Sequence, residues 1–157
     1  MKATILIDGV EYTGELVEKK KGKFRAKKHE KYWFMSRNGM IDWGYEVNLA
    51  TDNLLHLIGN YFATKEKAEE YKAYLEALGR VTHAVYEMND GWEPDWSDIV
   101  KRKWYIYFDN SKNTWGTDYN ITYQYPLVIP YIKSVDLAKK LIKDHLTDLE
   151  VIRKYKV

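Results

Sequence analysis

The sequence contains no cysteine, so the chain can form neither a disulfide bond nor a thiolate metal site. It also has no run of 18 apolar residues, which excludes a membrane-spanning helix. The apolar stretch near the N-terminus is too short for a secretory signal peptide. These absences predict a soluble protein of the cytoplasm that has no membrane partner.

Motifs that carry common chemistry are missing as well. There is no glycine-rich phosphate loop, no dinucleotide fingerprint and no closely spaced pair of histidines. The acidic residues in the segment 90–98 lack the alternating acid-and-glycine pattern of a calcium loop. We therefore expect no metal, no cofactor and no catalytic residue, and we predict that the protein is not an enzyme.

Charge is balanced overall but uneven along the chain. The formal net charge is +2, so neither steering of nucleic acid by total charge nor mimicry of DNA is implied. Segment 19–31 nevertheless holds eight basic residues against one acid, and segment 90–98 holds four acids and no base. Such runs are often no more than solvated loops. If the basic run is functional, its candidate contacts with phosphate are Lys27, Lys28 and Lys31.

Three β-hairpins are predicted from strand-like runs around turn-prone residues. Asp8-Gly9 and Asn38-Gly39 accept the positive φ angles of a two-residue type I′ turn, and the segment 109–113 is rich in turn-forming residues. The flanking runs hold many aromatic and β-branched residues, which suit a half-buried strand. The expected strands are 5–7 with 10–12, 31–35 with 40–43, and 103–108 with 114–115.

Helices are predicted after the second and the third hairpin. Thr64 and Ser134 are suitable N-caps, and apolar residues follow each of them at steps of three and four. The first helix would continue past Gly79 to residue 88, and a capping box at Thr147 would open a short last helix. A further extended stretch is expected before each helix, at 54–62 and 121–132.

These elements suggest an internal repeat within one domain. The helix starts match at an offset of 70 residues, and Tyr32-Trp33-Phe34 matches Trp104-Tyr105-Ile106 at an offset of 72. We predict an α+β fold in which two tandem β-hairpin/strand–helix units share an antiparallel sheet with helices on one face, preceded by a short N-terminal hairpin. The expected parts are 1–30 for the hairpin and basic stretch, 31–89 and 103–157 for the two units, and 90–102 for an acidic connector.

Aromatic residues are the most informative part of the composition. Six Trp and fourteen Tyr outnumber the four Phe, and both types have an apolar body with a polar tip. Alternation along the strands would expose some of these rings on the face of the sheet away from the helices, unless the N-terminal hairpin and loops cover them as core. Exposed rings anchor protein partners or stack on bases. The binding candidates are Trp33, Trp43, Asn60, Trp96, Trp104 and Tyr107, although Asn60 would alternatively satisfy backbone groups at a bulge.

Over residues 30–155 the chain resembles a family of small phage and prophage proteins of Gram-positive bacteria. The resemblance rests on an aromatic strand with Tyr32-Trp33-Phe34, the sequence Gly59-Asn60-Tyr61-Phe62, a Thr-capped acidic helix, Trp96-Ser97-Asp98 and a second aromatic strand. It implies a phage context and no particular activity. In that context we expect a noncatalytic accessory protein in the cytoplasm of an infected or lysogenic bacterium.

Two functions follow as hypotheses. The first is stoichiometric binding of a host or phage protein, as in an inhibitor that occludes an anti-phage defence component such as a CRISPR effector, or that captures a signalling nucleotide. The alternative is a single-stranded nucleic-acid or nucleotide binder that uses the basic stretch with Trp33 and Trp104. A homodimer through the aromatic sheet face is a further expectation.

Overall fold

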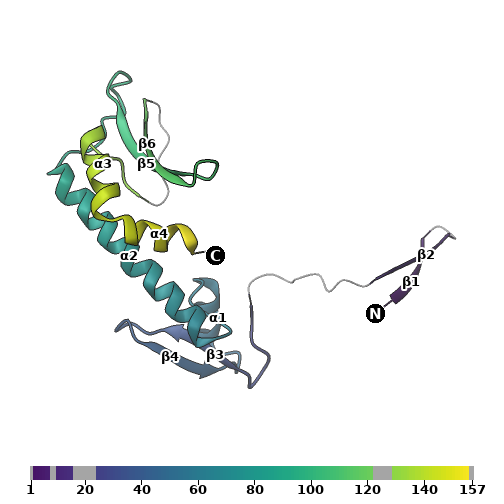
Figure 1. Cartoon of the computed structure of the whole chain (residues 1–157). Coiled ribbons are helices and arrows are strands. Elements are labelled where there is room, and N and C mark those ends of the chain that lie inside the picture. Colours follow the sequence, from purple (N-terminus) through teal and green to yellow (C-terminus); the bar gives the residue numbers. More distant parts are fainter. Residues whose placement is uncertain (1, 8–9, 16–23, 122–128, 156–157) are drawn as a thin grey trace.

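The computed structural model describes residues 2–7, 10–15, 24–121 and 129–155. Within these residues the chain forms three antiparallel hairpins and four helices, which confirms the predicted α+β class. In Figure 1 the long helix α2 (Lys65–Asn89) runs between a lower group of elements (β3, β4 and α1) and an upper group (β5, β6 and α3). Helix α4 (Leu146–Lys154) lies along α2 between the two groups.

The three predicted hairpins are present. Strands β1 (Lys2–Ile7) and β2 (Val10–Glu15) pair with Ile7 opposite Val10, while the Asp8-Gly9 turn lies outside the described residues. Strand β3 (Lys31–Met35) pairs with β4 (Ile41–Tyr45), and β5 (Lys103–Asp109) pairs with β6 (Thr114–Asn120).

The predicted shared sheet is wrong, because each described hairpin is a separate two-stranded sheet. The third extended stretch of each unit is reduced to a single bridge, Trp33 with Phe62 in the first unit and Trp104 with Ile132 in the second. Each bridge is closed by two backbone hydrogen bonds of 2.8–3.1 Å. The stretch cannot extend further because a helix N-cap follows two residues later in both units, at Thr64 and Ser134.

The two units have the same topology, namely a hairpin, a bridge and a capped helix. Thr64 and Ser134 accept hydrogen bonds of 3.3 Å from the third residue of their helices, which confirms both predicted N-caps. The bridges make Trp33 and Trp104 equivalent residues, 71 positions apart. The strand alignment predicted at an offset of 72 is therefore wrong by one residue. The backbone bridge defines which residues of the two units are equivalent, and the similarity of their aromatic sequences does not.

Helix α2 runs without a break through Gly79, as predicted, and ends at Asp90, which has the left-handed φ of 48°. Helix α3 (Val135–Asp144) ends at His145, and α4 begins directly after it. The capping box predicted at Thr147 is therefore wrong, because the chain is already helical from Leu146. Arg80 of α2 forms an ion pair of 2.7 Å with Asp148 of α4.

Helix α1 (Ala50–Leu57) replaces the first four residues of the extended stretch predicted at 54–62. The carboxylate of Asp52 accepts hydrogen bonds of 3.0 Å from the backbone N–H groups of Val47 and Leu49, which orders the start of this helix. The other predicted stretch, 121–132, falls largely outside the described residues.

The turn at Asn38-Gly39 also differs from the prediction. The N–H of Gly39 bonds to the carbonyl of Ser36, and Gly39 alone has a positive φ, of 77°. Asn38 and Gly39 are thus the last two residues of a turn that begins at Ser36, and the two-residue type I′ turn predicted here is wrong.

The buried residues form two clusters of unequal size. The larger one joins the C-terminal half of α2 to the second unit and consists of Val81, Ala84, Val85, Ile132, Ala138, Leu141 and Leu149. The smaller one lies against β3 and consists of Ala26, Tyr32 and Tyr61. Of the described helices, none combines the length and apolar character that crossing a bilayer requires.

Candidate functional site

The aromatic residues predicted to bind a partner are not equally accessible. Trp43 and Tyr107 keep 47% and 40% of their surface exposed. Trp33, Trp96 and Trp104 are half-buried. Of the predicted residues, the structure therefore leaves Trp43 of the β3–β4 hairpin and Tyr107 of the β5–β6 hairpin open to solvent and uses the other rings partly for packing.

An open group of aromatic residues lies on one face of the β3–β4 hairpin. Trp33 stands opposite Trp43, and Lys31 stands opposite Tyr45, so alternation directs all four side chains to the same face. We call these four residues the aromatic cluster. Tyr45 is 54% exposed, although it was not among the predicted site residues. The strand period of two, counted from Trp43, would have found it.

Contacts within the aromatic cluster fix its shape. The Lys31 ammonium lies 4.2 Å from the ring centroids of both Trp33 and Trp43. The rings of Trp43 and Tyr45 meet edge to face, with 5.5 Å between centroids and 80° between planes. A cation held over two indoles restrains all three side chains, so the exposed rings are ordered before any partner arrives.

The opposite face of the same hairpin is packed against the smaller core cluster. Tyr32 stacks on Tyr61 with 4.0 Å between centroids and 13° between planes. Tyr32 also covers Gly44 on the neighbouring strand, where an added Cβ would lie 3.2 Å from the tyrosine ring. The hairpin that carries the aromatic cluster is thus packed on its other face by Tyr32 and Tyr61, and we call this packed face the support of the cluster.

A buried network of charged and hydroxyl groups anchors this support. The carboxylate of Glu46, 1% exposed, accepts hydrogen bonds of 2.9 and 3.1 Å from Arg25 and of 2.8 Å from the Tyr61 hydroxyl. The Tyr32 hydroxyl donates a bond of 2.7 Å to Asp52, which is 3% exposed. The network links the segment before β3, β3 itself, the residue directly after β4, and α1, all of which are far apart in the sequence.

Both buried carboxylates are held in the ionised form. Hydrogen bonds from Arg25 lower the pKa of Glu46 against the opposing effect of burial, and Tyr61 adds to the lowering. Burial acts to raise the pKa of Asp52, but bonds from Tyr32 and two backbone N–H groups outweigh it and the pKa falls. The pKa of each tyrosine is raised, first by burial and then by its carboxylate partner. Because internal donors occupy these carboxylates, the network acts as a brace and offers no free base.

Asn60 also has a structural role. Its side-chain oxygen accepts a bond of 2.8 Å from Met35 N–H, and its side-chain nitrogen donates one of 2.6 Å to the Met35 carbonyl. The residue is 8% exposed. As the alternative interpretation of Asn60 predicts, its amide satisfies backbone groups at the end of β3 and so is not available to a ligand.

The second unit repeats the cation–aromatic pairing in weaker form. Arg102 lies 4.4 Å from the ring centroid of Tyr119, which stands opposite Trp104, and Arg102 is equivalent to Lys31 at the 71-residue offset. Trp104 packs against the larger core cluster, so it faces the helices and not the solvent. Trp96 contacts Tyr131 edge to face and lies 5.3 Å from the Lys103 ammonium.

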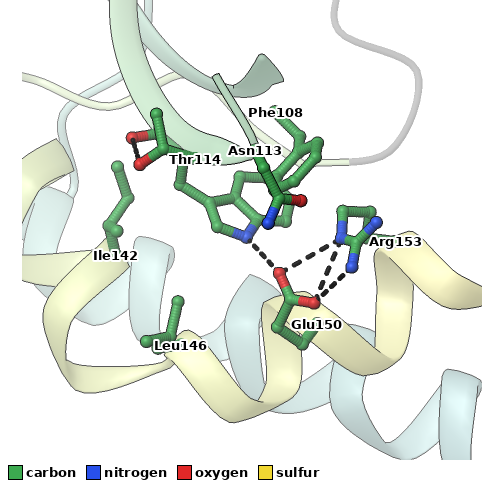
Figure 2. A pocket seen from close by; sticks show the side chains of 8 residues that line it. Phe108, Asn113, Thr114, Ile142, Leu146, Glu150 and Arg153 are labelled. Atoms are coloured by element: carbon green, nitrogen blue, oxygen red, sulfur yellow. Dashed lines mark hydrogen bonds and ion pairs between the residues drawn. The ribbon is translucent and has the colours of Figure 1, made fainter. Parts of the chain in front are cut away.

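A pocket of about 450 Å³ opens between the tip of the β5–β6 hairpin and the helices α3 and α4 (Figure 2). Glu150 lies at its base, where its carboxylate accepts a hydrogen bond of 2.9 Å from the Trp115 indole N–H and further bonds from two nitrogens of Arg153. These bonds, from Arg153 first and then from Trp115, lower the pKa of Glu150 to about 2. Arg153 in turn lies 4.2 Å from the ring centroid of Phe108. Glu150, Arg153 and Trp115 bond to one another, and these contacts stabilise the junction of the hairpin with the helices.

The basic and acidic runs lie in loops wherever they are described. Lys27 and Lys28 are exposed in the turn before β3, while residues 19–23 fall outside the described part. In the connector, Asp95 and Asp98 accept bonds from nearby backbone N–H groups and so shape local turns. Within the described residues, no three acidic or histidine side chains gather closely enough to hold a metal ion.

Comparisons of the chain with models of protein families, with curated proteins and with solved structures give no match. The similarity to phage proteins accordingly stays a prediction from the sequence.

Proposed function

We propose that the protein is a noncatalytic binding protein that contacts another protein through the aromatic cluster. The observation that carries this proposal is that Trp43 and Tyr45, 47% and 54% exposed, are held edge to face on a rigid hairpin. Large rings left in solvent cost free energy that a partner recovers when it covers them.

The chemistry of the cluster suits a protein partner. Trp and Tyr are enriched among the residues that dominate protein–protein affinity, because they bury much area with few rotatable bonds. Lys31 restrains the indoles, and the Tyr32–Tyr61 stack supports the strand from behind. Ordering before binding lowers the entropic cost of the complex.

The resemblance to phage proteins suggests the kind of partner. A small phage protein that binds stoichiometrically serves the phage by occluding a host component, and an anti-phage defence protein is the target we propose. Inhibition would then scale with the molar ratio of the two proteins and would not show turnover. The site of action would be the cytoplasm of the bacterial host.

The test is a pull-down from bacterial host lysate with the wild-type chain and with the double variant Trp43→Ala/Tyr45→Ala. We expect the wild type to retain a specific protein in a fixed molar ratio and the double variant to lose it. Tyr86→Ala is the matched control, because Tyr86 is a 64% exposed ring on α2, away from the cluster. Equal retention by wild type and double variant would contradict the proposal.

Nucleic-acid binding is the second candidate, favoured by the ammonium groups around the same rings. Lys31 lies within the cluster, and Lys27 and Lys28 are exposed just before β3. Basic residues beside stacking rings are the pattern of single-strand binding. Fluorescence anisotropy of labelled single-stranded RNA and DNA at low salt tests this candidate. We expect Trp43→Ala to weaken binding and Lys31→Gln to reduce its salt dependence, and an absence of binding by the wild type would exclude it.

A further inference from the structure

The aromatic cluster already holds a positive charge of the chain itself. The ammonium of Lys31 lies 4.2 Å from the ring centroids of both Trp33 and Trp43. Within the described part of the chain, this ammonium has no ion pair and no hydrogen bond. An exposed lysine is free to extend into water, so its place over two indoles reflects the negative potential of the ring faces. The cluster therefore has the geometry of a site for a cation.

The face of the hairpin that carries the cluster contributes no carboxylate. Asp42 of β4 stands opposite Phe34, so it belongs to the other face. A cation that enters the cluster is therefore attracted by the rings, as Lys31 is, and not by an acid of this face. The side chains that alternation places on the face are Lys31, Trp33, Met35, Ile41, Trp43 and Tyr45.

Guanidinium groups take up similar positions over rings elsewhere in the molecule. Arg153 lies 4.2 Å from the ring centroid of Phe108, and Arg102 lies 4.4 Å from that of Tyr119. These distances match the 4.2 Å between Lys31 and its indoles, so the spacing suits a guanidinium as well as an ammonium. A guanidinium is planar and less strongly hydrated than an ammonium, so it gains more by stacking on an indole. In competition for these rings, an arginine should displace Lys31.

We propose that the aromatic cluster recognises an arginine side chain of the partner protein, and that Lys31 occupies the site until that arginine replaces it. This inference rests on the protein-binding function proposed above and names the group that is recognised. Lys31 has no ion pair to break and a flexible stem, so its ammonium returns to water easily. The rings keep their places, because Trp33 is half-buried and Trp43 contacts Tyr45 edge to face.

The role of Lys31 distinguishes an arginine from an anionic ligand. If a phosphate or a carboxylate bound here, Lys31 would be its contact, and removal of the ammonium would weaken binding. If an arginine binds, Lys31 is its competitor, and removal of the ammonium strengthens binding. One substitution therefore has effects of opposite sign on the two kinds of ligand.

The experiment titrates the full chain with N-acetyl-arginine amide, which represents the side chain of the partner. Nuclear magnetic resonance follows the indole N–H signals of Trp33 and Trp43. N-acetyl-citrulline amide is the matched probe, because it has nearly the same shape and no charge. We expect the arginine probe to shift both signals to saturation and the citrulline probe to bind at least about tenfold more weakly.

Three variants and a control test the role of each group. Lys31→Ala should raise the affinity for the arginine probe about tenfold, because the internal competitor is gone. Lys31→Arg should lower it about threefold, because the new guanidinium would hold the rings more firmly. Trp43→Ala should abolish the shift of the remaining Trp33 signal. Lys139→Ala is the control, because Lys139 is exposed on α3 in the second unit and should leave the affinity unchanged.

The outcomes that would overturn the inference are specific. Equal binding of the arginine and citrulline probes would show that charge is not recognised. Weaker binding of the arginine probe by Lys31→Ala, or tighter binding of inorganic phosphate than of arginine by the wild type, would overturn it equally.

Failure of this inference differs from failure of the protein-binding function. A wild type that retains a protein through Trp43 and Tyr45 but does not bind the arginine probe would overturn the arginine site and keep the function. A wild type that binds the arginine probe but retains no protein from the lysate would support the cation site and contradict the function.

Discussion

Asn60 shows how a single side chain substitutes for a missing strand in the first unit. Strand β3 is followed in space by one bridged residue and not by a full third strand, so the backbone groups of Met35 have no ladder partner there. Both of them bond to the Asn60 amide instead, at 2.8 and 2.6 Å. A complementary donor and acceptor in one side chain suits this task.

Asn60→Ala should destabilise the protein by roughly 1–3 kcal/mol, since it leaves the Met35 N–H and carbonyl without partners. Urea unfolding followed by circular dichroism measures the loss. Asn110→Ala is the control, because Asn110 is exposed in the turn between β5 and β6, and it should change the free energy of unfolding by less than about 0.5 kcal/mol. Equal effects of the two substitutions would contradict the role assigned to Asn60.

Glu46 and Asp52 make the stability of the fold depend on pH. The folded state lowers the pKa of both carboxyls, so the unfolded chain binds protons more readily than the folded one as the pH falls. The contribution of the two carboxyls to the free energy of unfolding is therefore complete above their pKa values in the unfolded chain, near 4. It is lost as the pH falls through their lower pKa values in the folded protein. We expect the urea midpoint to fall steeply below pH 4.

Glu46→Gln separates this network from the other carboxyls. The variant should be less stable than the wild type at pH 7 by roughly 1–3 kcal/mol and should lose less stability on acidification, because one of the titrating groups is gone. Glu93→Gln, a change at an exposed site in the connector, should reproduce the wild-type acid profile. An unchanged profile in Glu46→Gln would show that other groups control the acid transition.

Some of these residue roles were visible in the sequence and others were not. The caps at Thr64 and Ser134 were predictable, because a cap acts on N–H groups three residues away. The Arg25–Glu46–Tyr61 network was not, because its members are brought together only by the tertiary fold. Alternation predicted that β5 would present two aromatic faces, but not that Trp104 would be on the one that faces the helices.

Among the elements, the hairpins show a recurring use of glycine opposite tyrosine. Tyr32 lies over Gly44 in the first unit, and Tyr107 lies over Gly116 in the second, where an added Cβ would come within 2.8 Å of the ring. The glycine leaves space for the ring, and the ring covers the backbone that the glycine exposes. Gly79 of α2 differs from both, because no atom beyond its chain neighbours and the backbone of its own helix lies within 4 Å of its hypothetical Cβ.

These surroundings predict opposite effects of the same substitution. Gly79→Ala should stabilise the protein by about 1 kcal/mol, since alanine restricts the unfolded chain and meets no obstacle in the helix. Gly44→Ala should destabilise it by about 1–3 kcal/mol, since the buried Tyr32 ring must move. Thermal unfolding of the two variants beside the wild type provides the measurement, and a destabilised Gly79→Ala would contradict the open environment described for α2.

Helix α1 is the element that sequence reasoning missed. Its run Leu54-Leu55-His56-Leu57-Ile58 is apolar at almost every position, so neither the strand period nor the helix period stands out. An apolar run of this length reads equally well as a buried strand. Its helical form depends on Asp52, whose carboxylate bonds to the backbone ahead of the helix, and that contact has no distinctive sequence pattern.

At the scale of the whole molecule, the hydrophobic core is concentrated at one end. The larger buried cluster joins α2, α3 and α4 near the second unit, whereas the first unit is held by three buried residues and a polar network. Apolar burial is the main source of stability, so the two ends should open with different free energies.

Hydrogen exchange followed by mass spectrometry should reveal this gradient. Amides around Val81 and Val85, both fully buried, should exchange most slowly. The amides of α1, where Leu57 is 79% exposed, should exchange at least about tenfold faster. This factor corresponds to a free energy of local opening that is about 1.4 kcal/mol lower for α1 than for α2. Uniform protection along α1 and α2 would show instead that the molecule opens as one unit.

The length of α2 sets a further constraint. A helix of 25 residues is a rod of about 37 Å, and in Figure 1 the β3–β4 hairpin lies near one end of α2 and the β5–β6 hairpin near the other. Lys31 with its indoles belongs to the first hairpin, and Tyr119, with Arg102 over its ring, belongs to the second. A rod differs from a flexible tether in that it cannot shorten, so these two equivalent groups never reach the same small ligand. Any molecule that engages both must itself offer two matching sites at that fixed separation. The protein would then select partners by the distance between those two sites.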